Sequence, residues 1–585
     1  MSKAPLTRYA WPATAALLTI AGVISLRAVN ENAVGSWGLW DVYPVLALLC
    51  VAGILILFVV ALVGDKGAAT LTVCLAGVLV LLHGSPTLIE QYPRFQVAWL
   101  HAAFIDQLAT NGTLATNFDA RFSWPGFFAA GATLVRVSGL DSAVTLLQWA
   151  PVLLVALSAV AVAAVTKALG ASTRTVWMSA LVFLLVDWVG QDYFAPQPTA
   201  YVITAAMLSL LLLAFRNRPP GMISKRLARW DPRWWPAVDP ARGTADLAMP
   251  LPTRLVILLA AALSILAVVA SHQLTPIAAG AALVLLALSG RLRPWPLALF
   301  TVVAFIGWLS YLGEPYWSGH VSNLFEDLFR PGQVVQSGVE QRVAGSPEHV
   351  LVLRVRMLFA VAVGVLGLAG LLLRWRGTGR LSVPALALAA APAFIVLAGS
   401  YGGEGFLRIY YFSLLGLVPM VAWLAFPDGR RPGRLKTGLI AGAALLAVPT
   451  FLVARFGNES FERVGREEVQ LAEQVKAQVP AGAVLLGLGD MATVQYQGLF
   501  IWDVIPAIPQ LDDPAAVTVR DIRTATADYP GRVYVVATPS QIAAGEQNYG
   551  YPPDWARTVR DRLVGTGKFR IVAEVGEGFI LESTS

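Results

Sequence analysis

The feature that most constrains this chain is a series of thirteen long apolar runs in its first 454 residues. Most approach the roughly 17–25 residues that an α-helix needs to cross a bilayer. Of the 585 residues, 56% are apolar and 14% are charged, against ~45–50% and ~25% in soluble proteins. A soluble enzyme, a disordered protein and a disulfide scaffold are thereby excluded, and a multi-pass α-helical membrane protein is predicted. The runs are centred on 10–28, 42–63, 69–84, 143–165, 175–190, 199–215, 255–271, 274–290, 295–312, 357–373, 381–400, 409–426 and 437–454.

The first run follows two basic residues and lacks a clear small-x-small cleavage site before Asn30. We therefore interpret it as an uncleaved signal anchor rather than a signal peptide. The stretch 124–140 is also apolar, but a proline, glycines and an arginine interrupt it. We expect this stretch to lie at the membrane surface or to re-enter the membrane.

The distribution of charge predicts the orientation. If the N-terminus is cytoplasmic and every run spans, the cytoplasmic segments hold 22 basic and 5 acidic residues, and the short outer segments hold 9 and 13. This asymmetry agrees with the positive-inside rule. The basic loop 216–254 is then cytoplasmic, so the net charge of +7 indicates topology and not nucleic-acid binding.

The last 130 or so residues are less apolar than the part of the chain before them. An amphipathic helical pattern covers 461–477, and four short β-rich runs and two further helical patterns follow. Such mixing predicts a small extracytoplasmic α/β domain. We divide the chain into N-terminal helices (1–68), a transmembrane core (69–455) with outer loops 85–140 and 313–356, and this domain (456–585). The β-rich runs are 483–487, 533–537, 569–574 and 578–582, and the helical patterns lie near 539–546 and 554–565.

Polar residues near the membrane boundary are costly, so they indicate function. The first such cluster, Glu90-Gln-Tyr-Pro-Arg-Phe95, opens the long loop after the third run, and the same loop carries His101 and Asp119. Apolar residues with helical spacing over 96–110 predict an interfacial helix. This helix would hold a carboxylate and an arginine at the membrane surface.

Three shorter clusters fall on the same predicted outer side, each between two consecutive runs. An arginine at this depth can bind a lipid-linked phosphate, because its planar fork matches phosphate oxygens. Carboxylates can act as general bases on an acceptor hydroxyl, and cations can hold a departing phosphate. The pattern therefore suits a sugar acceptor and an anionic lipid donor. The three clusters are Gln191-Asp-Tyr-Phe-Ala-Pro-Gln197, Ser271-His-Gln-Leu-Thr-Pro276 and Tyr401-Gly-Gly-Glu-Gly-Phe-Leu-Arg408.

On these features the chain resembles the GT-C superfamily of integral-membrane glycosyltransferases. It is similar in plan to the protein O-mannosyltransferases, aminoarabinose transferases and arabinofuranosyltransferases. That family places an acidic motif at the start of its first large outer loop, followed by interfacial helices, and Glu90, 96–110 and 118–140 look like that arrangement. Asp192 matches the family's second acidic site. The chain departs from the family in having no Asp-x-Asp or Asp-Glu pair in the first loop, so Asp106 and Asp119 are alternatives to Glu90 as the base.

The resemblance implies transfer of a sugar from a polyprenyl-phosphate donor to a glycan, lipid or protein acceptor of the cell envelope, at the outer face of a bacterial plasma membrane. Glu90 or Asp119 would be the base, and Asp192 would orient the acceptor or hold a metal. Arg94, His272 and Arg408 would hold the lipid phosphate. The remaining predicted substrate-binding residues are Tyr92, His101, Tyr193, Gln197, Gln273 and Glu404.

The sequence requires no cofactor, although isolated carboxylates could bind Mg²⁺ or Mn²⁺. The expected partners are the lipid-linked donor, the acceptor and membrane lipids, without nucleic acid. One alternative is a transporter or flippase, for which Asp187 is a candidate intramembrane charge. No inverted repeat and no matching pair of broken helices supports it. An envelope-polymer ligase or polymerase is a third possibility that would share the outer-face site.

Overall fold

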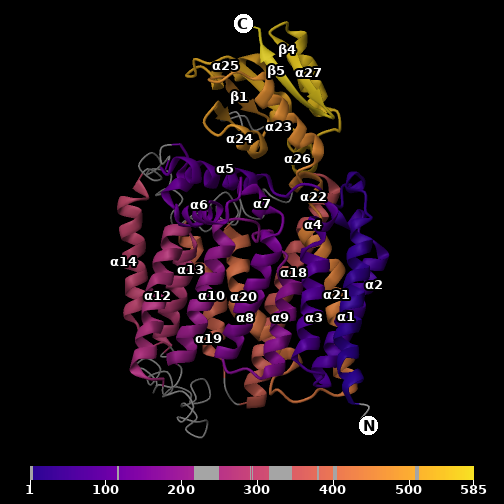
Figure 1. Ribbon diagram of the computed structural model, residues 1–585, viewed down its shortest axis with the longest axis vertical. Helices are drawn as coiled ribbons and strands as arrows, with labels where there is room; N and C mark the ends of the chain where they lie inside the picture. The colour runs from indigo at the N-terminus through magenta and orange to yellow at the C-terminus, as the bar shows by residue number, and fades with distance from the viewer. Residues whose placement is uncertain are drawn as a thin grey trace.

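The protein is a helical bundle with a small α/β domain on one end (Figure 1). The computed structural model describes residues 4–114, 118–215, 249–289, 292, 294–314, 345–378, 381–398, 405–506 and 513–584. The first helix begins at the end of the bundle opposite the C-terminal domain (Figure 1). The predicted fold class, a multi-pass helical membrane protein with a C-terminal α/β domain, is confirmed.

Within these residues, eight helices are long and apolar enough to cross a membrane. Their apolar composition leaves backbone groups no partner in lipid except those within the helix, which is why each run folds as one helix. The eight are α1 (Ala4–Arg27), α2 (Val45–Val63), α8 (Ala150–Ala168), α10 (Pro196–Phe215), α12 (Leu251–Ser271), α18 (Pro347–Thr378), α20 (Gly405–Ala425) and α21 (Arg434–Phe456).

The other five predicted runs are also helical, but they are shorter. All thirteen runs therefore form helices, and eight of them reach full spanning length. Helix α18 begins at Pro347, ten residues before the predicted start of that run. The last part of the predicted loop 313–356 is therefore helical. The five are α3 (Ala68–Val78) with the π-helix η3 (Leu79–His83), α9 (Thr173–Val186), α13 (Thr275–Leu288), α14 (Pro296–Tyr311), and α19 (Val383–Ala390) with η6 (Ala391–Ala398).

A layer of short helices covers the bundle on the side of the C-terminal domain. The expected interfacial helix is α5 (Gln96–Asn111), and its apolar face packs on α6 (Gly126–Ser138), the helix expected at the surface. Phe95 precedes α5 with a φ of 64°, which turns the chain sharply into the helix. The other elements outside the bundle helices are η1 (Glu31–Ala33), η2 (Leu39–Asp41), α4 (Ser85–Ile89), η4 (Ala120–Ser123) and α7 (Val144–Leu147).

The C-terminal domain has a five-stranded sheet in the order β2-β1-β3-β5-β4. β1 is parallel to β2 and β3, and β5 is antiparallel to β3 and β4. The four predicted strands are present; the three-residue β2 and the short helices α24 and α25 were too brief to predict. The elements are α22 (Glu459–Glu462), α23 (Arg466–Gln478), β1 (Val484–Gly487), α24 (Ala492–Gln497), β2 (Asp503–Ile505), η8 (Pro514–Ala516), α25 (Val519–Ala525), β3 (Val533–Ala537), α26 (Pro539–Tyr549), α27 (Trp555–Gly565), β4 (Phe569–Val575) and β5 (Gly578–Ser583).

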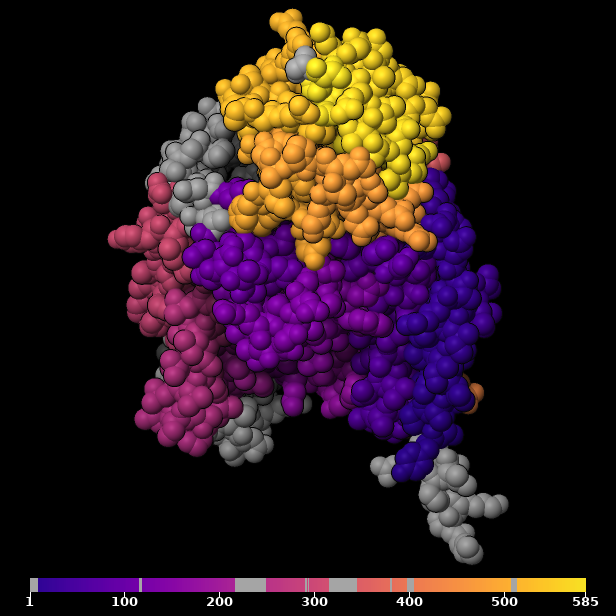
Figure 2. Space-filling model, turned by 45° about the horizontal axis from the view of Figure 1, so that its top comes forward, coloured from indigo at the N-terminus to yellow at the C-terminus, as the bar shows by residue number. Residues whose placement is uncertain are grey.

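Helix α24 fixes this domain to the outer layer. The ring of Tyr496 meets that of Trp99 on α5 edge to face, with centroids 5.5 Å apart. Its hydroxyl lies 3.0 Å from Ser142 Oγ. Ala492 and Leu499 belong to the same hydrophobic cluster as the buried face of α5. The domain therefore rests directly on the outer layer, as Figure 2 shows.

Candidate functional site

The predicted site residues that the structure describes lie on the side of the bundle that carries the C-terminal domain, in or near two places. The first place is a cavity of about 210 Å³ that we call the outer cavity. Helices α5, α6, α10, α12 and α20, the short helix η4 and the turns beside them supply its wall. Six of the predicted residues line it, although they come from four separate stretches of sequence. The lining residues are Val97, His101, Arg121, Trp124, Phe128, Tyr193, Pro196, Gln197, Ser271, His272, Gln273 and Arg408.

The two histidines of the outer cavity are held in defined tautomers. Nδ1 of His101 lies 3.0 Å from the carbonyl oxygen of Phe194. A carbonyl can only accept, so Nδ1 carries the hydrogen and Nε2 presents a lone pair. The reverse holds for His272, whose Nδ1 accepts the backbone N–H of Thr275 at 3.1 Å. His101 thus offers an acceptor, and His272 offers an N–H donor at Nε2.

Both imidazoles are neutral at ordinary pH. Burial, with a smaller contribution from Arg121, lowers the pKa of His101 to about 4. Burial and the neighbouring Arg408 lower the pKa of His272 well below its usual value. The ring of His101 also stacks on Tyr193, with centroids 5.9 Å apart and planes 16° apart. The aromatic pair gives one side of the cavity a flat apolar face next to hydrogen-bonding groups.

Two arginines lie in the wall of the outer cavity. Arg408, at the start of α20, is buried. Arg121 makes two hydrogen bonds to Asp119, from Nε to Oδ1 at 2.9 Å and from Nη2 to Oδ2 at 2.8 Å. No carboxylate is among the described residues that line this cavity. Arg408 and the N–H group of His272 therefore suit an anion, whereas Arg121 is already paired with Asp119.

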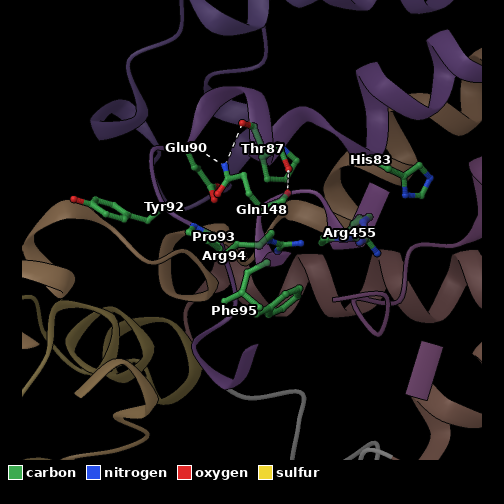
Figure 3. Close-up of a pocket in the computed structure, with 12 residues that line it drawn as sticks. His83, Thr87, Glu90, Tyr92, Pro93, Arg94, Phe95, Gln148 and Arg455 are labelled. Atoms are coloured by element: carbon green, nitrogen blue, oxygen red, sulfur yellow. Dashed lines mark hydrogen bonds between the residues drawn. The ribbon is translucent and has the colours of Figure 1, made fainter. Parts of the chain in front are cut away.

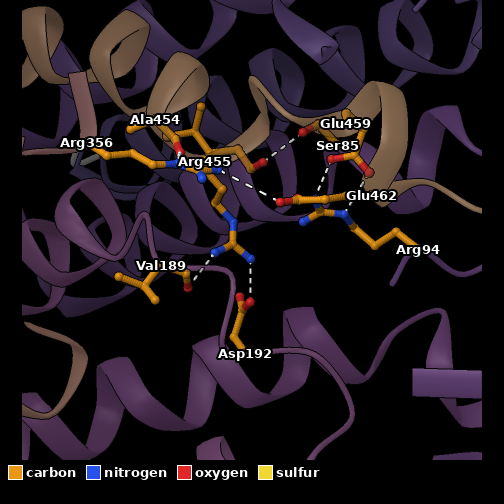
Figure 4. Close-up of polar contacts among 10 residues, drawn as sticks. Ser85, Arg94, Val189, Asp192, Arg356, Ala454, Arg455, Glu459 and Glu462 are labelled. Carbon is orange, nitrogen blue, oxygen red and sulfur yellow. Dashed lines mark hydrogen bonds and ion pairs between the residues drawn. The ribbon is translucent and has the colours of Figure 1, made fainter. Parts of the chain in front are cut away.

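The second place is a group of charged side chains that we call the buried charge cluster. It consists of Arg94, Glu459 and Glu462 (Figure 4). Arg94 Nε donates to Glu459 Oε1 at 2.8 Å, and Arg94 Nη2 donates to Glu462 Oε2 at 2.7 Å. Arg356 of α18 also approaches Glu462, at 3.9 Å. Arg94 therefore joins the first outer loop to the segment after α21, and it does not line the outer cavity.

Glu90 lies beside this cluster in a closed space of about 10 Å³, which Tyr92 and Arg94 also line (Figure 3). Such a space holds about one water molecule. Burial raises the pKa of Glu90 well above its usual range, and the neighbouring Glu459 raises it further. A carboxyl in this setting is held in its neutral form, as a proton donor rather than a base.

Asp192 pairs with an arginine that the sequence did not single out. Arg455, in the last turn of α21, donates to Asp192 and, at 3.0 Å, to the carbonyl oxygen of Val189 (Figure 4). The side chains of Asp192 and Arg455 are 1% and 2% exposed. His83 Nδ1 lies 4.0 Å from the same carboxylate. Asp192 thus sits inside an ion pair, next to Tyr193 but not in the wall of the outer cavity.

Sequence reasoning missed several residues of both places. Arg121 could have been selected from the sequence, because it follows the candidate base Asp119 by two positions. Arg455 and Glu459 carried no local signal, since their partners lie far away in the sequence. Glu404 falls outside the described residues. Among the residues that the structure describes, no group of three or more His, Cys, Asp or Glu side chains could hold a metal ion.

Comparison with solved structures gives the fold of the chain. No protein-family model and no curated protein matches the sequence. ArnT from Cupriavidus metallidurans, solved bound to undecaprenyl phosphate, is 14% identical, with a TM-score of 0.50 over 88% of this chain and 98% of that one. ArnT is a GT-C superfamily membrane glycosyltransferase. The chain has the GT-C fold.

A second similar structure is the Archaeoglobus fulgidus oligosaccharyltransferase tethered to an acceptor peptide. It is 13% identical, with a TM-score of 0.49 over 86% of this chain and 70% of that one. The likeness to ArnT confirms, at the level of fold, the superfamily resemblance inferred from the acidic and basic clusters of the outer loops. The likeness to ArnT extends through both the helical bundle and the C-terminal part of the chain, given the coverage of both proteins.

Proposed function

We propose that this chain is a glycosyltransferase that moves a sugar from a polyprenyl-phosphate donor to a glycan, lipid or protein acceptor of the cell envelope. The reaction takes place at the outer face of a bacterial plasma membrane, on the side of the C-terminal domain. The observation that carries the proposal is the outer cavity, which combines two arginines, a histidine N–H donor and an aromatic wall at the membrane boundary. The GT-C fold and the undecaprenyl phosphate bound by ArnT support it.

In the proposed reaction, an acceptor hydroxyl attacks the anomeric carbon of the donor sugar. The new C–O bond forms as the bond to the phosphate oxygen breaks, and polyprenyl phosphate leaves. Arg408 and His272 would hold the phosphate, where cations and N–H donors stabilise the charge that develops. Tyr193 and His101 would support the sugar ring, with Gln197 and Gln273 as further hydrogen-bonding groups.

The base that takes the hydroxyl proton is proposed to be Asp119. Of the three candidate carboxylates, it alone is bonded to a residue that lines the outer cavity, Arg121. Glu90 is held neutral beside the buried charge cluster. Asp192 is 1% exposed in its pair with Arg455, whereas Asp119, although paired with Arg121, keeps a side chain that is 21% exposed. The role of Glu90, Asp192 and Arg94 is then to hold the outer layer in place. A divalent cation is not required by this scheme.

The first test measures binding of undecaprenyl phosphate and of undecaprenol to the purified full-length protein. The phosphate form should bind more tightly, because only it offers an anion to the outer cavity. Arg408→Gln should weaken binding of undecaprenyl phosphate on the order of 10- to 100-fold, which corresponds to the loss of a hydrogen bond to a charged group. Arg430→Gln is the matched control, since that arginine is 86% exposed and lies at the opposite end of the bundle. Equal binding of the two lipids would contradict the proposal.

The second test measures transfer itself, with a panel of radiolabelled polyprenyl-phosphate sugars added to membranes that contain the protein. Wild-type membranes should move label from one donor into an envelope fraction. Asp119→Asn should abolish that transfer while leaving undecaprenyl phosphate binding intact. Full transfer by Asp119→Asn, with loss in Glu90→Gln, would return the role of base to Glu90.

A further inference from the structure

A second, much larger hollow lies on another side of the bundle. It is a groove of about 890 Å³ between α9, α18, α20 and α21, and its wall is apolar apart from a few residues near its ends. A volume of this size is at the upper end of the range for small-molecule sites. Small side chains on α21, such as Ala443 and Ala447, leave the space open. We call it the lateral groove.

The lateral groove runs along the bundle rather than across it. On α21 its lining extends from Lys436 to Val453, which is about 25 Å at the rise of an α-helix. The hydrocarbon core of a bilayer is ~30 Å thick. Helix α20 joins the wall only through its last turns, at Val421, Leu424 and Ala425, so the groove has its full set of four helices at the end away from the C-terminal domain.

The two ends of the lateral groove differ in charge. At the end near the C-terminal domain, Arg356 donates to the carbonyl oxygen of Ala454 at 2.6 Å and approaches Glu462. Arg455 is paired with Asp192. The cations beside this end are therefore already engaged by acidic and carbonyl oxygens.

At the opposite end, Lys436 lines the groove directly. The carboxylate of Asp65 pairs there with Arg174 and Arg431, and Asp428 pairs with Arg430. Among the residues that the structure describes, no carboxylate lies within 4.0 Å of Lys436. At this end the apolar wall of the lateral groove thus adjoins an ammonium group. The apolar wall suits the acyl chains of a lipid, and the ammonium group suits its anionic head group.

The lateral groove is separate from the outer cavity. The two share no lining residue, and the groove is built on α9, α18 and α21, which contribute nothing to the cavity wall. A donor whose phosphate lies at Arg408 therefore does not place that phosphate in the groove. The occupant must carry its charge at the end where Lys436 lies.

We propose that the lateral groove is a binding site for an anionic phospholipid from the leaflet on the side away from the C-terminal domain. Its acyl chains lie between α18 and α21, and its phosphate contacts Lys436. The site goes beyond the proposed transferase reaction and does not depend on it. The bound lipid fills space beside α9 and α18 that protein side chains leave open.

The test is native mass spectrometry of the full-length protein with phosphatidylglycerol and, separately, phosphatidylcholine of the same chain length. Wild type should retain phosphatidylglycerol preferentially. Lys436→Gln should reduce that preference about fivefold, the effect of one basic residue on an anionic lipid, whereas Lys167→Gln, an exposed lysine at the same end on α8, should not. Ala443→Trp, which fills the groove from an exposed position, should lower retention of both lipids, unlike the lipid-facing control Ala267→Trp on α12.

Three results would overturn the proposal. Equal retention of both phospholipids by wild type would mean that the groove does not recognise the head group. Equal retention of phosphatidylglycerol by Lys436→Gln and Lys167→Gln would show that the lipid phosphate does not contact Lys436. Displacement of phosphatidylglycerol from wild type by equimolar undecaprenyl phosphate, with undecaprenyl phosphate retained by wild type and not by Ala443→Trp, would assign the groove to a polyprenyl chain instead.

Discussion

The ion pair between Asp192 and Arg455 allows a structural role to be separated from a catalytic one. Both side chains are almost fully buried, and Arg455 also donates to the Val189 carbonyl oxygen at 3.0 Å. Removing one partner of a buried pair leaves an uncompensated charge, at a cost of about 3–5 kcal/mol. Asp192→Asn and Arg455→Gln should therefore each lower the thermal unfolding midpoint of the detergent-solubilised protein clearly.

The double variant Asp192→Asn/Arg455→Gln leaves two neutral amides in place of two charges. Its loss of stability should be smaller than the sum of the single losses, by about 0.5–3 kcal/mol as for other residues in contact. Arg430→Gln serves as control and should stay within about 0.5 kcal/mol of wild type, because surface substitutions rarely cost more. The four variants and wild type are compared by scanning fluorimetry in the same detergent.

Unfolding of Asp192→Asn at the wild-type midpoint would contradict the structural role of this ion pair. Loss of sugar transfer by that variant with unchanged stability would instead identify Asp192 as a functional carboxylate, as its match to the second acidic site of the family predicts. Additive losses in the double variant would show that Asp192 and Arg455 act independently.

Two further predictions concern groups outside the membrane-spanning helices. Because burial and Glu459 raise the pKa of Glu90, Glu90 contributes stability that is complete below its ordinary pKa of ~4.3 and is lost as the pH rises toward its folded-state pKa. The unfolding midpoint of wild type should thus fall relative to that of Glu90→Gln as the pH rises above the ordinary pKa of Glu90, and parallel curves would exclude this titration. Ser142 Oγ donates to Asp106 at 2.6 Å, so Tyr496 must donate to Ser142. Tyr496→Phe should weaken the attachment of α24 by about 1 kcal/mol, seen as faster hydrogen exchange in α24, and unchanged exchange would contradict that role.

The helices of this fold follow from the sequence because lipid imposes one solution on each apolar run. The positions of the outer polar residues follow for a related reason. A residue in a short turn between two spanning helices, such as His272 or Tyr193, has little choice but to lie at the membrane boundary. That is why residues from four separate stretches meet in the outer cavity.

The pairing among these residues does not follow from the sequence. Arg94 binds Glu459, 365 positions later, and nothing near Arg94 indicates a carboxylate partner other than Glu90. Asp192 likewise finds Arg455 across 263 positions. Local patterns therefore identify which residues lie at the outer face, whereas the packing of α21 against the bundle decides which of them are neutralised and which face the cavity.

The shared hydrophobic cluster of α5 and α24 has a consequence for how the protein is made. Helix α5 is synthesised within the first fifth of the chain, but Ala492, Tyr496 and Leu499, which cover it, come near the end. Until they arrive, part of the apolar face of α5 has no cover, and Arg94 lacks Glu459. The wall of the outer cavity can therefore reach its final form only after α21 and α24 of the C-terminal domain have been synthesised and have packed against the bundle. A chain that stops short of residue 499 would carry the cavity residues of the bundle without the support that holds α5 over them.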